Sequence, residues 1–151
     1  MKKSLVALRD ETLRDGAQQP GINLTSSDRL EIALLISDVL NSSNSKVRNQ
    51  IDLGMPEVSD KLLSTIRNTA KILTKQTSGL DFFVTGRATK ESIDRMCESL
   101  SEVPKDRQII APFIGISEVH RKNLGLNKKD VLKKIIDAIV YAKRYVKRIN
   151  F

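Results

Sequence analysis

The sequence has no tryptophan, one cysteine and one histidine among its 151 residues, and aromatic residues make up only 4%. A core must therefore be built mainly from Leu, Ile and Val. The single Cys97 excludes an internal disulfide, and a single histidine excludes a two-histidine metal site made by this chain alone. No apolar run approaches the roughly 18 residues that span a bilayer, and the first one breaks at Arg9 and Asp10. We therefore expect no membrane segment, no signal peptide and a cytoplasmic location.

Glycine-rich phosphate loops are also missing, because neither GxGxxG nor GxxxxGK[ST] occurs. Their absence argues against a dinucleotide-binding or P-loop protein, because these loops are the sequence signature of both classes. The net charge of +8 favours anionic partners without choosing among them. Many basic residues of the last quarter fall on the polar positions of an amphipathic helix, with only Tyr141 and Tyr145 among them to stack on bases. We therefore do not expect nucleic-acid binding, which a steep loss of affinity with salt would reveal.

The chain alternates short apolar segments with amphipathic ones, a pattern that predicts strands followed by helices. Helix starts are marked by capping residues at Thr25, Ser59, Thr89 and Asn127. The expected strands are Leu5–Leu8, Gln50–Gly54, Leu80–Thr85, Gln108–Ile114 and the terminal 148–151.

This alternation predicts a mainly parallel sheet, for which two architectures compete. An open doubly wound sheet could be complete at this length, whereas an eight-stranded barrel usually needs about 250 residues. Length alone favours the open sheet. The absence of a phosphate-binding loop, however, counts against the open sheet.

Charged and polar side chains follow the predicted strands. Arg14, Asp15 and Gln18 come after the first, Asp52 ends the second, Arg87 follows the third, and Ser117, Glu118 and His120 follow the fourth. Ligands of parallel α/β folds bind at the carboxyl ends of the strands. We therefore expect these groups to converge on one rim.

The segment RDETLRDGAQQPGINLTSSDRLEIA resembles the opening signature of the DRE-TIM metallolyase family. That family includes 2-isopropylmalate, homocitrate and citramalate synthases and hydroxymethylglutaryl-CoA lyases, and its domain is also called HMGL-like or pyruvate carboxyltransferase. Weaker matches follow in the family's order: IDLGMPEVSD, VTGRATKESID and APFIGISEVHRKNLGLNKKDVLKKIIDAIVYAKRY. The resemblance covers essentially the whole chain. It identifies residues 1–151 as one domain, the N-terminal half of a (β/α)8 TIM barrel, with about four β/α units and the start of strand five.

The resemblance also implies a chemistry, the metal-dependent Claisen condensation of an acyl-CoA with a 2-oxo acid. Asp15 would bind the divalent metal, Mg, Mn or Zn, and Arg14 would be catalytic by stabilising an oxyanion. Gln18, Asp52, Arg87, Ser117 and His120 would contact substrate. A hard cation prefers carboxylate oxygen, and a guanidinium offers two aimed donors to an oxyanion.

Two positions depart from the family pattern. Ala17 stands where many members carry Glu, and Asp52 stands where Glu is usual. The family's His-x-His metal ligands and its later catalytic acid or base have no counterpart here. We therefore expect this chain alone to be inactive, and its open strand edges to associate with a second copy or a missing half-barrel.

Other functions stay open from the sequence alone. The chain could be a non-catalytic half-barrel binding module, or a part of a carbon–carbon lyase like the hydroxymethylglutaryl-CoA lyases. Neither the 2-oxo acid nor the metal is specified by the residues present.

Overall fold

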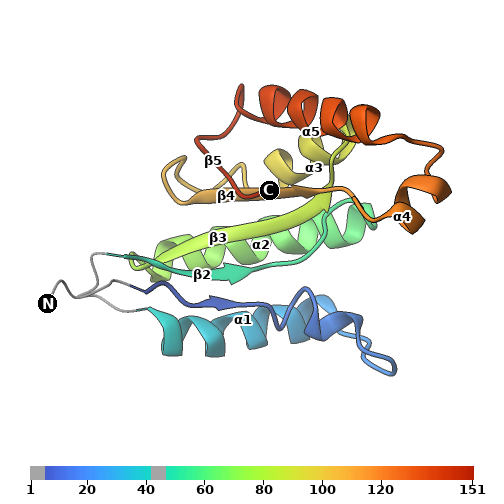
Figure 1. The fold of residues 1–151 in the computed structure, drawn as a ribbon. Helices are drawn as coiled ribbons and strands as arrows, with labels where there is room; N and C mark the ends of the chain where they lie inside the picture. Colours follow the sequence, from blue (N-terminus) through green and yellow to red (C-terminus); the bar gives the residue numbers. More distant parts are fainter. Residues whose placement is uncertain (1–5, 42–46) are drawn as a thin grey trace, which may run out of the picture.

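The computed structural model describes residues 6–41 and 47–151. Five strands form one parallel sheet in the order β1-β2-β3-β4-β5. They are β1 (Arg9–Asp10), β2 (Asn49–Asp52), β3 (Leu80–Arg87), β4 (Gln108–Phe113) and β5 (Arg148–Ile149). Strands that neighbour in sequence therefore also neighbour in space, as Figure 1 shows.

The four long helices begin where the sequence predicts them. They are α1 (Ser26–Leu40), α2 (Asp60–Gln76), α3 (Lys90–Ser99) and α5 (Lys128–Ala142), together with a short α4 (Glu118–Asn123) and the 3-10 helix η1 (Gly16–Gln18). The side chains of all four expected caps, Thr25, Ser59, Thr89 and Asn127, accept backbone N–H groups of the first turn. Sequence reasoning did not predict η1 or α4.

The strand order decides between the two architectures. A doubly wound sheet reverses its strand order at a switch point, whereas this sheet runs in chain order throughout. Helices α1, α2, α3 and α5 pack side by side in sequence order as one layer against the sheet (Figure 1). The fold is thus α/β and matches the first part of a TIM barrel, as predicted.

The apolar core lies between this helical layer and the sheet. Ile51, Phe82, Val84 and Ile110 contribute from the strands, and each is fully buried. Because side chains alternate across a strand, the residues between them point to the opposite face. That face carries Asp52, Asp81, Phe83, Thr85, Ile109 and Ala111, and in a barrel it becomes the interior.

The first strand is the main correction to the sequence prediction. We expected it at Leu5–Leu8, but it lies at Arg9–Asp10, paired with Gln50 and Ile51 of β2. Leu5 is outside the described residues. Val6 and Leu8 are 72% and 59% exposed, so these two side chains do not form core. The physical reason is that this two-residue strand consists of charged residues, Arg9 and Asp10, and apolar periodicity cannot mark such a strand.

Candidate active site at the carboxyl ends of the strands

The chain turns sharply after β1, and the turn explains why charges follow this strand. The N–H groups of Arg14, Asp15 and Gly16 all donate to the carbonyl oxygen of Glu11, at 3.1, 2.9 and 3.2 Å. The N–H of Thr12 donates to Asp10 Oδ1 at 2.9 Å. The turn directs Arg14 toward the inner face of the sheet, where it lines a pocket.

The loop after β2 packs tightly against this turn at Gly54. Gly54 has φ +118°, and a Cβ there would lie 3.3 Å from the carbonyl oxygen of Leu13. Only glycine fits this conformation and this approach without strain. The guanidinium of Arg29 donates to the same Leu13 carbonyl at 2.9 Å. The two strand ends are thereby held together.

Asp52, at the end of β2, is a fully buried carboxylate. It accepts hydrogen bonds from the N–H of Gly54 at 2.9 Å and from the hydroxyl of Thr85 at 2.8 Å. Its Oδ2 lies 3.7 Å from Nε of Arg14. Burial raises the pKa of Asp52 to about 7, against the lowering effects of both hydrogen bonds, while the charge of Glu11 raises it and that of Arg14 lowers it. Near neutral pH this group can therefore gain or lose a proton.

Arg14 is surrounded by carboxylates. Its Nε donates to Glu11 Oε2 at 2.9 Å, and its Nη2 forms an ion pair with the same oxygen at 2.8 Å. Its Nη1 donates to Asp15 Oδ1 at 3.1 Å. Burial acts to lower the pKa of Arg14, but the hydrogen bond and charge of Glu11, together with Asp52 and Asp15, leave it raised. The guanidinium is permanently charged, which suits it to bind a negatively charged oxygen.

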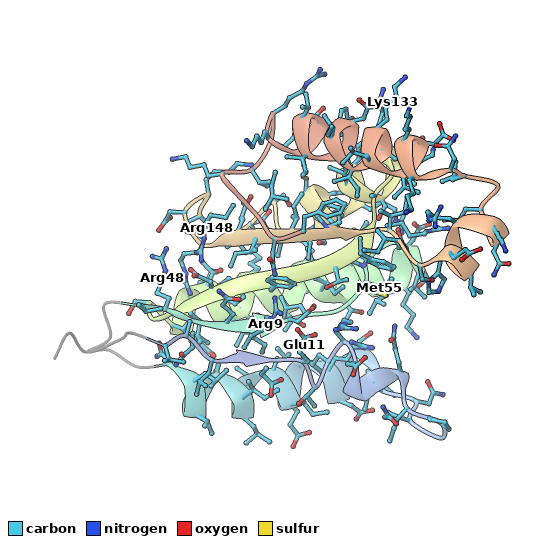
Figure 2. The ribbon with its side chains drawn as sticks, viewed as in Figure 1. Arg9, Glu11, Arg48, Met55, Lys133 and Arg148 are labelled. Carbon is cyan, nitrogen blue, oxygen red and sulfur yellow. The ribbon has the colours of Figure 1, made fainter. Side chains whose placement is uncertain are left out.

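Arg14 and Glu11 border a pocket of about 460 Å³ on the inner face of the sheet, whereas Asp15 and Asp52 do not line it. Gln18 reaches it from η1, and its amide contacts Met55 Sδ at 3.3 Å. Arg9 covers the ring of Phe83, 4.2 Å from its centroid. Figure 2 shows Arg9 and Glu11 beside β1, with Met55 beyond the end of β2. The other lining residues are Thr85, Ala111, Pro112, Phe113, Asn150 and Phe151.

The structure thus brings four of the seven predicted site residues together: Arg14, Asp15, Gln18 and Asp52. Arg87 is placed differently. Its Nε and backbone N–H donate to Glu57 at 3.0 and 3.2 Å, and its side chain lines a neighbouring pocket of about 370 Å³.

The last two predicted residues, Ser117 and His120, form a pair of their own at α4. The Ser117 hydroxyl caps the helix and lies 2.9 Å from His120 Nδ1. The imidazole packs on Gly115, where a Cβ would lie 2.6 Å from its Cγ. Both side chains are exposed, and neither lines the two pockets at this rim. Their predicted role as substrate contacts therefore stays a prediction.

Sequence reasoning missed Arg9, Glu11, Thr85 and Glu57. Arg9 and Glu11 are two residues apart in an extended segment, so their side chains share one face. That spacing was the available signal, but it could be read only once the strand was placed correctly.

A divalent metal would find one predicted ligand here. The carboxylate of Asp15 is 65% exposed and accepts from Arg14. Within residues 6–41 and 47–151, no three His, Cys, Asp or Glu side chains group closely enough to hold a metal ion. The described residues therefore do not form a complete donor set.

The consecutive parallel β/α units, with an arginine and buried carboxylate at the strand ends, define a partial (β/α) barrel with a charged rim. The family model described as HMGL-like matches residues 5–151, and the chain belongs to this family. No helix of the described segments is long and apolar enough to cross a membrane.

Curated relatives agree with this assignment. The chain is 33% identical over 147 residues to "2-isopropylmalate synthase 1" of Caldanaerobacter subterraneus subsp. tengcongensis, covering 97% of the chain and 34% of that protein. It is 33% identical over 145 residues to "2-isopropylmalate synthase" of Dictyoglomus turgidum, covering 94% and 26%. It is 32% identical over 147 residues to "Homocitrate synthase" of Sulfolobus acidocaldarius, covering 97% and 29%. The chain thus spans about a third or less of these relatives.

Proposed function

We propose that this chain forms the N-terminal part of an acyltransferase of the 2-isopropylmalate/homocitrate synthase type. Such an enzyme would join an acyl-CoA to the carbonyl carbon of a 2-oxo acid. The observation that carries the proposal is the Arg14 guanidinium, which borders the inner pocket 3.7 Å from the buried Asp52. A permanent cation at this position can stabilise negative charge on a carbonyl or enolate oxygen.

Each predicted residue has a role in this proposal. Arg14 holds the oxyanion, and Asp15 supplies one carboxylate to a divalent metal whose other ligands lie outside the described residues. Gln18 contacts the substrate in the same pocket. Asp52, with its pKa near 7, can hold or release a proton beside Arg14.

Arg87, Ser117 and His120 lie farther along the same rim and are proposed as contacts for the distal part of a substrate. The Arg87 guanidinium borders the adjacent pocket, which shares Phe113 with the first one.

Binding of a 2-oxo acid tests this function most directly. Pyruvate would be titrated into the purified chain with Mg²⁺ or Mn²⁺ and followed by NMR. We expect Arg14→Lys to weaken binding, because a single ammonium cannot reproduce the two-donor fork. Arg67→Lys is the matched control, since Arg67 pairs with Glu98 on the outer helices. Equal binding by wild type and Arg14→Lys, or no binding at all, would favour the alternative of a non-catalytic module.

The chain alone is expected to show little or no acyl transfer. Release of the CoA thiol from acetyl-CoA, in the presence of a 2-oxo acid and either metal, would be the measurement. Robust thiol release by the pure 151-residue chain would contradict this expectation.

We also propose that the chain associates with a further half-barrel or with a second copy of itself. Apolar side chains stand exposed on the outer edge of α5, with Leu132, Ile136 and Val140 at 57%, 52% and 54%. At the opposite edge, Leu35 and Val39 of α1 are 62% and 84% exposed. Both stripes lie beside the edge strands, where further β/α units would continue the sheet. Sedimentation equilibrium tests this, and a clean monomer at high concentration would count against it.

A further inference from the structure

We propose that Glu11 is a gate for the anion site: its carboxylate occupies the Arg14 guanidinium when no ligand is bound, and a ligand oxyanion must displace it. The inference rests on the proposed function only in taking Arg14 as the group that meets the ligand. It makes Glu11 a residue that sets affinity and selectivity, although it need not contact the reacting atoms.

The first support is how completely carboxylates engage Arg14. One oxygen of Glu11, Oε2, accepts a hydrogen bond from Nε at 2.9 Å and lies 2.8 Å from Nη2 in an ion pair. The third nitrogen, Nη1, donates to Asp15 at 3.1 Å. The edge formed by Nε and Nη2 is the one that binds a carboxylate or enolate side-on, and here Glu11 already holds it. An incoming anion therefore competes with a carboxylate of the protein itself.

The second support is that the Glu11 carboxylate has an alternative cationic partner close by. Its other oxygen, Oε1, forms an ion pair with Nε of Arg9 at 2.8 Å. Arg9 lines the same pocket and is supported from below by the ring of Phe83. When a ligand takes Arg14, Glu11 can swing toward Arg9 and keep a charged partner. Displacement therefore costs one ion pair and does not leave a carboxylate unpaired.

A comparison with the Glu57–Arg87 pair distinguishes a displaceable carboxylate, the gate, from one that only holds an arginine in place, which we call a brace. The Glu57 side chain is 8% exposed and accepts from both the backbone N–H and the guanidinium of Arg87, so it is fixed in place. The Glu11 side chain is 29% exposed, and its ion-pair partners are the guanidinium groups of Arg9 and Arg14. A carboxylate held by side chains alone, at the wall of a pocket, is free to change rotamer.

The gate has a consequence for selectivity. A weakly basic monoanion gains little by replacing one carboxylate with another on the same arginine. A ligand that carries two anionic oxygens, or a second group that binds elsewhere in the pocket, gains enough to displace Glu11. Glu11 would thus keep Arg14 from simple cellular anions until such a ligand arrives.

The test measures anion binding without metal and without catalysis. Sulfate and pyruvate would be titrated separately into the 151-residue chain at low ionic strength, following the Nε–Hε signal of Arg14 by ¹H–¹⁵N NMR. Glu11→Gln keeps the shape and removes the competing charge, and we expect it to tighten binding at Arg14 by about tenfold or more. Glu118→Gln is the matched control, because it makes the same charge change in a surface pair with Lys122. It should change affinity by less than about twofold.

A second variant separates the gate from general electrostatics. Adding Arg14→Gln to Glu11→Gln should abolish the gain, because the freed site is then absent. Binding by this double variant is followed instead by the backbone amide signals of Gln18 and Met55, which line the same pocket. Equal or weaker anion binding by Glu11→Gln than by wild type would overturn the proposal, and so would a gain that survives Arg14→Gln. An Arg14 signal that broadens in ligand-free Glu11→Gln would show that Glu11 is a brace, which also overturns it. Acyl transfer enters none of these readouts, so a failure of the proposed function would be seen separately.

Discussion

Each end of the sheet holds a buried aspartate, and the two aspartates differ in how closely they are paired with arginine. At the amino end, Asp81 of β3 is 2% exposed and lies between two guanidinium groups, Arg48 at 2.6 Å and Arg148 in direct contact. At the carboxyl end, Asp52 of β2 is also fully buried, but its nearest cation is 3.7 Å away. Figure 2 shows Arg48 and Arg148 together at the end opposite Met55.

The surroundings of Asp81 and Asp52 differ in the same way as the two aspartates do. Arg48 also donates to Asp106, and the buried Arg107 donates to the carbonyl oxygens of Leu80 and Thr77 at 2.7 and 2.8 Å. Polar groups of the amino end are thus largely satisfied by one another. At the carboxyl end, Arg14 is shared among three acidic residues and borders an open pocket. One end is paired for stability, whereas the other keeps charges available to a ligand.

The largest expected effect comes from breaking the paired end with Asp81→Asn. This change leaves Arg48 and Arg148 facing each other without their shared counter-charge. We expect a loss of about 2–3 kcal/mol in the free energy of unfolding at pH 7, measured by denaturant titration. Asp106→Asn, which removes an exposed partner of the same Arg48, should leave the midpoint nearly unchanged. Equal effects of the two variants would contradict the assignment of Asp81 as the structural centre.

The next effect concerns the pH dependence contributed by Asp52. The folded pKa of Asp52 is raised to about 7, above its unfolded value, so the folded state binds more protons between about pH 4 and 7. The stabilisation from the neutral carboxyl is complete below pH 4 and is lost as pH rises through 7. For Asp52→Asn we expect the decline in the free energy of unfolding between pH 5 and 8 to shrink by about 2 kcal/mol.

The matched control for this prediction is Asp38→Asn, a substitution at an exposed position of α1. It should keep the decline of the wild type. An unchanged pH profile for Asp52→Asn would show that Asp52 is ionised throughout this range.

The smallest effect compares two helix caps at this rim, one on an exposed helix and one on a helix that packs on the sheet. Ser117 caps α4, none of whose residues is buried, whereas Thr89 caps α3, which packs on the sheet. We expect Thr89→Ala to cost about 1 kcal/mol of global stability, and Ser117→Ala to leave the global midpoint unchanged. Hydrogen exchange should instead accelerate in residues 118–123 of Ser117→Ala. A global loss from Ser117→Ala would mean that α4 is part of the cooperative core.

Sequence reasoning predicted the helices best, because capping residues and apolar periodicity are local signals. The caps of α1, α2, α3 and α5 are all confirmed, and so is β3, which the structure extends from Thr85 to Arg87. It failed at β1, because a strand made of two charged residues has no apolar alternation. It also missed α4, because six exposed residues leave no apolar stripe to detect.

The sequence by itself determined the order of the five strands and the four long helices, the family, and the presence of Arg14, Asp15, Gln18 and Asp52 at strand ends. Those features are encoded in neighbouring residues. Tertiary structure alone decided that Asp52 is buried beyond close reach of a cation, that Glu11 covers Arg14, and that Arg87 belongs to the adjacent pocket. Burial and ion pairing depend on which side chains meet across strands, and residues as distant in sequence as Asp52 and Thr85 meet only when the sheet forms.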